Sequence, residues 1–403
     1  MTKLKLLIYS DLPVLPTGYA RQMKDILPFL RKEFDIVYVA LNSDGKEELK
    51  AQMDFQVYPR VPGSRKAFDF RDEVYHALST QQIDLIFTDY DWRVTMEGMD
   101  GLARFPHIPW VAWSCYEGEP MIEGWRHGMQ FCNCLIAQTD YHARQLRDFV
   151  GLSEFHIETV MPAVNPKIFM KADYEKFIKP EREAKNLLDK RVILSIGKNQ
   201  RRKNFGALIE GVALAGDKYH LHIITFDVTN DEGFDLQGLA DYYGLENFTY
   251  YDGSQGFMED GYINYWYNIA NCFVLTSQGE GVGMPLLESM ATGTRVLAPD
   301  YGAMGEVVRK FKGGLLFDKD KCVFNHGPVK SGFREIYVSP QEIADKLEKV
   351  FNIFPTCSLK ELEPEQVAER LIKIIYTVHE RTKSRPNDYM FKTVFPPMRF
   401  SYA

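Results

Sequence analysis

The fold is decided by the stretch Asn-Cys-Phe-Val-Leu-Thr-Ser-Gln-Gly-Glu-Gly-Val-Gly-Met-Pro-Leu-Leu-Glu, residues 271–288. It begins as a short apolar run, passes through a loop with glycines at 279, 281 and 283, and continues as a helical pattern with Pro285 in its first turn. This order predicts a buried strand, a tight loop and a helix, the repeating unit of an α/β fold. The glycines let a ligand approach the backbone, and the helix start offers unpaired N–H groups to an anion.

The same alternation of apolar runs and helical patterns extends along the whole chain of 403 residues. Because domains usually hold about 100 to 200 residues, this length favours two domains. We predict two doubly wound, Rossmann-like α/β domains with parallel sheets, since the strands are continuous apolar runs. The expected strands begin at Lys3, Phe34, Ile83, Ile108 and Cys134 in the first domain, and at Arg191, His220, Phe248, Asn271, Arg295 and Gly313 in the second.

The domain boundaries follow from composition. We expect a first domain over residues 1–170, a charged, strand-poor linker over 171–190, and a second domain over 191–378. A proline-containing tail, 379–403, is expected to return to the first domain. Two such domains leave a cleft between the carboxyl edges of their sheets, where open α/β folds bind ligands.

Charge and cysteine content exclude several classes of protein. The chain has 48 Lys and Arg against 55 Asp and Glu, a net charge of −7, which argues against charge-driven nucleic-acid binding. The six cysteines show neither zinc-ligand nor disulfide spacing. No segment reaches the roughly 18 apolar residues of a membrane span. The apolar stretch at the amino terminus is too short for a signal peptide. We therefore expect a cytoplasmic protein with no bound metal.

A second motif, Ser195-Ile-Gly-Lys-Asn-Gln-Arg-Arg-Lys-Asn204, follows the first expected strand of the second domain. Lys198, Arg201, Arg202 and Lys203 crowd a strand-to-helix turn at the expected cleft, where they would neutralise a diphosphate. The alternatives are a solvated loop or a small nucleic-acid contact.

Glu280 and Glu288 lie in the first motif, eight residues apart, one in the loop and one about a turn into the helix. This spacing lets both carboxylates face one ligand from different heights. The alternative is a plain glycine-rich turn with solvated carboxylates.

With these residues in place, the chain resembles a known family, the family-four retaining glycosyltransferases of the GT-B fold. The resemblance rests on the segments GKNQRRKN (197–204), EGVGMPLLE (280–288), ATGTRVLAPDYGAMGEVV (291–308) and MPAVNPKIF (161–169). It covers most of the second domain. Ala163 replaces a family glycine and Asn165 a family aspartate in the segment that crosses between the domains.

The resemblance implies roles for these residues. Glu280 would lie near the transferred sugar, and Glu288 would accept hydrogen bonds from the ribose of a nucleotide. Lys203 would neutralise the diphosphate, together with Lys198, which stands where the family usually has an arginine and so lacks the bidentate fork. The donor-binding residues implied are Gly18, Gly197, Arg202, Gly281, Val282, Gly283, Met284, Pro285, Leu286 and Glu288.

The first domain resembles the family less closely. Pro16-Thr-Gly-Tyr-Ala-Arg21 follows the first strand, as does the family's glycine-containing loop near donor and acceptor. The alternative is an ordinary helix cap at Thr17. Glu117 lies where many members place a histidine or aspartate beside the sugar, and it joins Glu280, Lys203 and Lys198 as an expected catalytic residue. His107 is expected to be structural. The residues expected on the acceptor side are Tyr19, Arg21, Asp91 and Arg93.

Two features admit another interpretation. Asp89-Tyr-Asp91 follows a strand, and such a pair binds a metal and a nucleotide diphosphate in glycosyltransferases of the other major fold, GT-A. Two such carboxylates are also common in surface turns. The aromatic cluster at 262–267 has helical spacing, which favours packing over a stacking platform.

The resemblance thus implies transfer of a sugar from a nucleotide diphosphate sugar to a hydroxyl acceptor with retention, without a metal or other cofactor. The acceptor is left open: a sugar, a metabolite, or a hydroxymethylated base of phage-type DNA entering the cleft flipped. Two other functions compete, a nucleotide-sugar 2-epimerase and a non-catalytic nucleotide-sugar sensor. The oligomeric state is not predicted.

Overall fold

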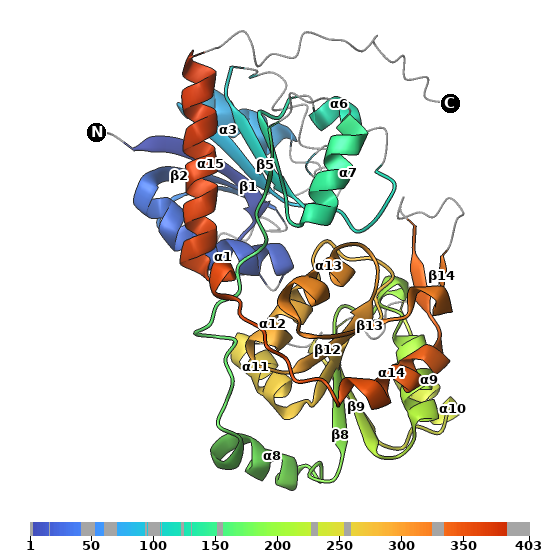
Figure 1. The fold of residues 1–403 in the computed structure, drawn as a ribbon. Helices are drawn as coiled ribbons and strands as arrows, with labels where there is room; N and C mark the ends of the chain where they lie inside the picture. Colours follow the sequence, from blue (N-terminus) through green and yellow to red (C-terminus); the bar gives the residue numbers. More distant parts are fainter. Residues whose placement is uncertain are drawn as a thin grey trace.

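The structure is a computed structural model that describes residues 3–15, 17–41, 53–59, 71–92, 95, 105, 107–121, 125–129, 131–150, 156–226, 233–253, 259–324 and 334–384. These residues form two domains, each a parallel β-sheet between layers of helices, stacked one above the other (Figure 1). This is the doubly wound α/β architecture that the sequence predicts.

The first sheet has seven strands in the order β3-β2-β1-β4-β5-β6-β7, and every pair is parallel. Its strands are β1 (Leu4–Asp11), β2 (Phe34–Leu41), β3 (Gln56–Pro59), β4 (Leu85–Asp89), β5 (Trp110–Ser114), β6 (Cys134–Ala137) and β7 (Ile157–Thr159). Five of them were predicted; the two edge strands, β3 and β7, were not. The helices described in this domain are α1 (Gly18–Glu33), α3 (Arg71–Thr80), α6 (Arg126–Met129) and α7 (Asp140–Val150).

The second sheet has six parallel strands in the order β10-β9-β8-β11-β12-β13. All six were predicted: β8 (Arg191–Ile196), β9 (Tyr219–Thr225), β10 (Phe248–Asp252), β11 (Cys272–Val274), β12 (Arg295–Pro299) and β13 (Gly314–Phe317). The helices around it are α9 (Phe205–Ala215), α10 (Leu236–Tyr242), α11 (Asp260–Ile269), α12 (Met284–Ala291), α13 (Gly302–Phe311) and α14 (Pro340–Val350). A small antiparallel pair, β14 (Cys322–Phe324) and β15 (Ile336–Val338), stands apart from this sheet.

The chain crosses between the domains twice. The outgoing segment follows β7, and the returning one precedes α15 (Pro364–Ser384). The two crossings meet where the Val164 N–H donates to the carbonyl of Leu362, at 2.8 Å. Within the expected linker, a π-helical turn (Tyr174–Ile178) leads into the short helix α8 (Lys179–Ala184).

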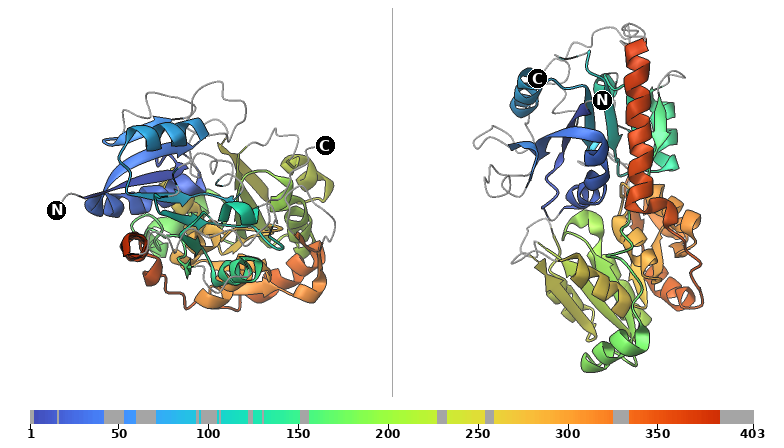
Figure 2. Two further views of the ribbon diagram at one scale, coloured as in Figure 1. Left: turned by 90° about the horizontal axis from the view of Figure 1, so that it is seen from above. Right: turned by 90° about the vertical axis from the view of Figure 1, so that its left-hand side faces the viewer.

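Helix α15 corrects the predicted end of the second domain. It runs along the first domain beside α1, as two views at right angles show (Figures 1 and 2). Its apolar face, from Val367 to Val378, joins the core that includes Leu6, Ile26 and Leu30. The chain therefore returns to the first domain near residue 364 rather than after 378. Most of the expected tail, residues 385–403, lies outside the described residues.

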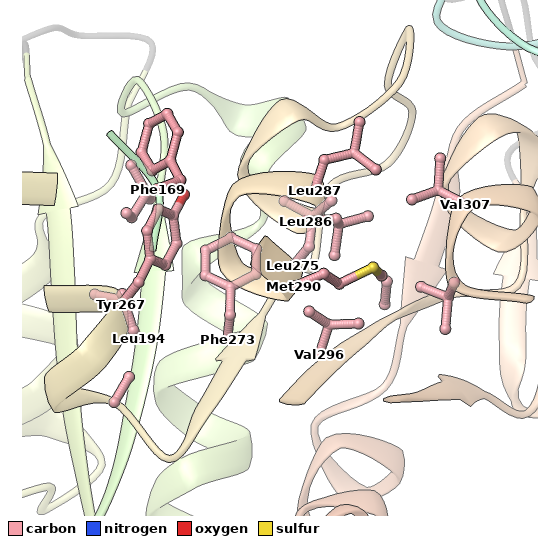
Figure 3. Packing of buried hydrophobic residues seen from close by; sticks show 14 of the residues in the cluster. Phe169, Leu194, Tyr267, Phe273, Leu275, Leu286, Leu287, Met290, Val296 and Val307 are labelled. Carbon is pink, nitrogen blue, oxygen red and sulfur yellow. The ribbon is translucent and has the colours of Figure 1, made fainter. Parts of the chain in front are cut away.

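The core beneath α12 holds the glycine-rich loop in place. Leu286, Leu287 and Met290 of α12 pack over the sheet against Phe273 and Val296 (Figure 3). In the same cluster, Phe169 of the outgoing crossing contacts Tyr267 edge to face, with ring centroids 6.1 Å apart. The glycine-rich loop and the crossing segment therefore share one core. Along the described part of the chain, no helix is both long enough and apolar enough to cross a bilayer.

Candidate functional site

The strand order in each sheet reverses at one point, between β1 and β4 in the first sheet and between β8 and β11 in the second. Ligands of open α/β sheets bind outside the carboxyl ends of strands at such a reversal. The loops that follow β1, β4, β5, β8 and β11 carry the predicted site residues. The topology therefore collects residues from 17 to 288 around one cleft.

The centre of the site is a cluster of two cations around Glu280. Lys203 Nζ lies 2.5 Å and Arg202 Nη1 lies 3.1 Å from Glu280 Oε1. Lys203 and Glu280 are only 12% and 11% exposed. Burial would raise the pKa of Glu280, but Arg202 and Lys203 outweigh it and lower the pKa to about 2. The carboxylate is therefore ionised throughout the neutral range.

Backbone contacts fix this cluster between two loops. The turn Arg201–Lys203 is tied to the β11–α12 loop, because the Gln278 N–H donates to the Arg202 carbonyl at 2.8 Å and the Thr276 hydroxyl to the Lys203 carbonyl at 2.9 Å. Arg202 also donates to the carbonyl of Gly279 at 2.6 Å. These hydrogen bonds to the β11–α12 loop thus position Arg202 and Lys203.

Glu117, from the loop after β5, joins the cluster from the first domain. Its carboxylate lies 3.2 Å from Arg202 Nη2, so Arg202 bridges the acids of both domains. Burial and the nearby Glu280 raise the pKa of Glu117, although Arg202 opposes the shift. The structure therefore brings three of the four predicted catalytic residues together.

Lys198, the fourth, is partly buried and lies two residues after the end of β8. Gly197, between them, faces the Lys203 side chain. Asn199 anchors this loop from below: its buried side chain accepts from the Phe234 N–H at 3.0 Å and donates to the Phe234 carbonyl at 2.9 Å.

The glycine-rich loop ends in the start of α12. Gly283 has a φ of 82°, a left-handed conformation that favours glycine, and Pro285 follows in the first turn of the helix. The side chains of Val282 and Leu286 are buried in the core, so of these residues only backbone groups are left to face a ligand. Met284 and Pro285 are partly exposed. The loop thus offers amides at a helix start, as an anion site requires.

Gly281 of this loop lies against Cys115 of the first domain. A Cβ atom added to Gly281 would lie 2.7 Å from Cys115 Cβ, which is closer than real Cβ contacts allow. Cys115 Sγ in turn lies 2.7 Å from the hydroxyl of Tyr19, and the Tyr19 ring stacks on Tyr90 at 4.2 Å. The absence of a side chain at 281 is what permits the domains to close.

Glu288 is almost fully buried, at 1% exposure, and both its oxygens have partners. Arg21 Nη1 of the first domain lies 2.6 Å from Oε1, and the Tyr267 hydroxyl donates to Oε2 at 2.8 Å. Arg21 Nε also lies 3.0 Å from Asp260 at the start of α11. Arg21, expected on the acceptor side, therefore reaches the residue expected to bind the donor ribose.

The start of α1 is capped as the alternative interpretation proposed. The Thr17 hydroxyl accepts from the Ala20 N–H at 3.1 Å and donates to the buried carboxylate of Asp11. Gly18 begins the helix with open space where a Cβ would lie. Pro16 and Arg93, which belong to predictions about this region, lie outside the described residues.

The two carboxylates of the Asp89-Tyr-Asp91 motif lie in different surroundings. Asp89 is fully buried, and burial together with Asp11 raises its pKa well above the ordinary value. Asp91 is partly buried near Tyr19 and Cys115, whose pKa values are raised chiefly by burial, with smaller contributions from Asp91. Within the described ranges, no three His, Cys, Asp or Glu side chains gather as a metal site would need.

Sequence reasoning missed two residues of this site, Tyr267, which contacts Glu288, and Asp260, which contacts Arg21. Tyr267 belongs to the aromatic cluster interpreted as packing, and Trp266 and Tyr267 are indeed buried. The Tyr267 hydroxyl nevertheless donates a hydrogen bond to Glu288. A tyrosine five residues before an apolar strand carried no signal that separates these roles, and Asp260 lay in no motif.

A second set of contacts joins the two domains at a place that does not involve Glu280. Glu306 of α13 accepts from the N–H groups of Asp140 and Tyr141, at 2.8 and 2.5 Å, and so caps the start of α7 in the first domain. Nearby, the Glu119 N–H donates to the Tyr301 hydroxyl at 3.2 Å. The structure therefore has its two domains closed on each other.

Part of the chain matches a known protein family. Residues 177–322 fit the family model described as "Glycosyl transferases group 1". This range includes both predicted motifs of the second domain.

Similar proteins with assigned names are distant relatives. A D-inositol 3-phosphate glycosyltransferase of Thermobifida fusca is 25% identical over 261 residues, which cover 58% of this chain and 58% of that protein. A serotype-specific mannosyltransferase WbdA of Escherichia coli is 26% identical over 184 residues, covering 44% of this chain and 22% of its own. The chain thus matches less than two thirds of the length of these relatives.

Solved structures resemble the chain over almost its whole length. Sucrose-phosphate synthase from Thermosynechococcus elongatus covers 97% of this chain and 100% of its own, with a TM-score of 0.65 and 16% identity. The Anabaena protein HepE, solved in complex with UDP and glucose, covers 96% of this chain and 100% of its own at the same TM-score and identity. At such low identity the likeness shows the fold.

Proposed function

We propose that the protein moves a sugar from a nucleoside diphosphate sugar to a hydroxyl group of an acceptor, because residues 177–322 match the model of the group 1 glycosyl transferases and the chain has the GT-B fold. The observation that carries the proposal is the partly buried cluster of Lys203, Arg202 and Glu280 beside the start of α12. Its cations lie where the two domains meet, and they suit an anion.

The chemistry follows from what such a transfer needs. As the bond between the sugar and the diphosphate breaks, negative charge develops on the leaving oxygen, and preorganised cations and amides lower the barrier. Lys203, Lys198 and the amides at the start of α12 supply this stabilisation. Glu280 keeps the Lys203 ammonium in place while the nucleotide is absent, and Glu288 receives the ribose hydroxyls.

We propose that the transfer retains the configuration of the anomeric carbon. A donor phosphate oxygen takes the acceptor proton on the face from which the diphosphate leaves, so the step needs no separate protein base. Closure of the domains positions the acceptor against the sugar and excludes water. The contact of Glu117 with Arg202 supports this step, because it links the acceptor domain to the diphosphate cations.

The acceptor is a sugar, a metabolite or a hydroxymethylated nucleic-acid base, classes that share a free hydroxyl. The test is a thermal-shift screen of UDP-, GDP-, ADP- and dTDP-sugars, followed by mass spectrometry of acceptor pools incubated with the donor that stabilises most. A product heavier than the acceptor by one sugar residue is expected.

Other outcomes would overturn the proposal. Conversion of the donor into an epimer without any acceptor, detected by NMR, would make the protein a 2-epimerase. Donor binding with neither transfer to any acceptor nor donor hydrolysis would make it a sensor.

A further inference from the structure

Glu288 stands at the junction of three elements, although its part in the proposed function is only to hold ribose. It projects from α12 and is 1% exposed. Tyr267 of α11 donates to one of its oxygens, and Arg21 of α1, in the other domain, contacts the other. Its orientation is therefore set from both domains at once.

Within the second domain, the buried Tyr267 fixes one oxygen of Glu288. Tyr267 is fully buried, packed against Phe169 and Phe273, with ring centroids 6.1 and 5.8 Å away. Burial and Glu288 raise the pKa of its hydroxyl well above the usual value, so the hydroxyl stays protonated and can only be the donor. This contact is present whatever the position of the first domain.

The contact of Arg21, from the first domain, with Glu288 depends on closure of the two domains. Arg21 bridges Glu288 at 2.6 Å and Asp260 at 3.0 Å, and both acids belong to the second domain. Its guanidinium also lies over the ring of Phe169, 5.8 Å from the centroid. Opening the cleft would separate Arg21 from all three and leave Glu288 with Tyr267 as its remaining described side-chain partner.

The Glu288 carboxylate keeps unused hydrogen-bond acceptor positions in this arrangement. Its two oxygens offer about four acceptor positions, and Arg21 and Tyr267 use one on each oxygen. The remaining positions suit two hydroxyls of a sugar ring. With both oxygens held, Glu288 loses little rotational freedom when the ribose arrives.

We propose that Arg21 and Tyr267 are positioning residues for Glu288, and that Arg21 couples binding of a nucleotide ribose to closure of the two domains. The inference rests on the proposed function. Because Arg21 contacts Glu288 only when the cleft is closed, any ligand that prefers the fixed carboxylate also favours the closed form. Donor binding and assembly of the acceptor side are thereby linked through one side chain.

The test compares ribonucleotides with their 2′-deoxy counterparts by isothermal titration calorimetry. UDP, GDP and ADP serve as probes, and the tightest binder is paired with its 2′-deoxy form. Loss of one hydrogen bond to a charged group should weaken binding to the wild-type protein about tenfold. In Tyr267→Phe and in Arg21→Gln we expect this ratio to fall to about threefold or less, and in Arg21→Lys to recover in part.

Small-angle scattering then separates the two residues. Arg21→Gln should enlarge the radius of gyration of the nucleotide-free protein, whereas Tyr267→Phe should leave it unchanged. Lys24→Gln is the matched control, because Lys24 is on the same helix and contacts Asp260 at 3.2 Å. It should alter neither the ratio nor the radius.

Three results would overturn the inference in distinguishable ways. Tighter ribonucleotide binding by Arg21→Gln would mean that Arg21 competes with the ribose. An unchanged ratio in both Tyr267→Phe and Arg21→Gln would mean that neither positions Glu288. If the wild-type protein bound none of the probes, the proposed function itself would fail, and the inference with it.

Discussion

Lys203 is the residue on which the proposed chemistry depends most. Its ammonium group is nearly buried and is shared with Glu280, and Arg202 stands on the other side of that carboxylate. We expect Lys203→Ala to lower donor turnover by about 100-fold or more, because the leaving diphosphate would lose a preorganised cation. Little stability should be lost, because Glu280 keeps Arg202 as its partner. Turnover is measured by release of the nucleoside diphosphate.

Arg201→Ala is the matched control for that variant. Arg201 belongs to the same turn as Lys203 but is exposed. Its removal should change turnover less than about threefold if position, rather than charge in general, decides the effect. Equal losses in both variants, or full activity of Lys203→Ala, would contradict the role given to Lys203.

Asp25 makes stability depend on pH. It is 8% exposed on α1, and Asn165 Nδ2 of the crossing segment donates to it at 2.9 Å. Burial raises its pKa to about 6, although Asn165 opposes the shift and Asp260 adds to it. In the unfolded chain the pKa is near 3.9. The folded state therefore binds more protons between these values, and stability present below about pH 4 is lost as the pH rises through about 6.

Asp25→Asn should remove this dependence, since an amide keeps a hydrogen-bond acceptor for Asn165 without the charge. The free energy of unfolding of the variant relative to wild type should rise by up to about 3 kcal/mol between about pH 4 and pH 7. Urea denaturation at both values measures the difference, with the exposed Asp35→Asn as the control variant. A difference that does not change with pH would show that the buried carboxyl does not titrate in this range.

At the scale of elements, α15 joins the end of the chain to the first domain. Leu371 is fully buried in the core shared with α1, and Arg370 donates to the carbonyl of Thr159 at 2.7 Å. Leu371→Ala should lower the free energy of unfolding by about 2 to 5 kcal/mol, because it removes buried apolar groups and leaves a cavity. The exposed Lys373→Ala, on the same helix, should cost less than about 0.5 kcal/mol.

Denaturant unfolding measures both variants, and tryptophan fluorescence provides the signal because Trp110 and Trp113 are buried in the first sheet. A loss in Leu371→Ala no larger than in Lys373→Ala would contradict the packing of α15 on this domain.

Helix α15 also shows which property of an element the sequence does not predict. Its spacing of apolar residues predicts a helix over 364–382, and the structure has one over Pro364–Ser384. The periodicity indicates that one face of the helix is buried, but it does not indicate which domain covers that face. The predicted boundary at 378 was therefore wrong. The strands β3 (Gln-Val-Tyr-Pro) and β7 (Ile-Glu-Thr) were missed because neither is a continuous apolar run, unlike the equally short strands β6, β11 and β13.

At the scale of the molecule, the site is assembled by two domains whose relative placement no local pattern encodes. The loops around Lys203 and Glu280 could be placed at strand ends from the sequence, because parallel strands bring their carboxyl ends to one edge. The pairing of Arg21 with Glu288, 267 positions apart, could not. It depends on how the first sheet is set above the second, which is decided by contacts such as Glu306 with the start of α7.

Closure itself can be tested at Gly281, where a methyl group would meet Cys115 at 2.7 Å. Gly281→Ala should hold the cleft open by a fraction of an ångström to an ångström and reduce turnover by about 100-fold, since misplacement on that scale has such an effect on transfer. The melting temperature should change little, because each domain keeps its core. Gly261→Ala, with open space around its Cβ position, is the control and should retain turnover.

The clash predicts a specific rescue. Cys115→Gly removes the side chain that the new methyl group meets, so the double variant should recover most of the turnover lost in Gly281→Ala. If the loss came instead from the altered backbone of the glycine-rich loop, the double variant would be no more active than Gly281→Ala. Recovery in the double variant, together with a larger radius of gyration in Gly281→Ala alone, would establish that transfer requires the closed arrangement seen in this structure.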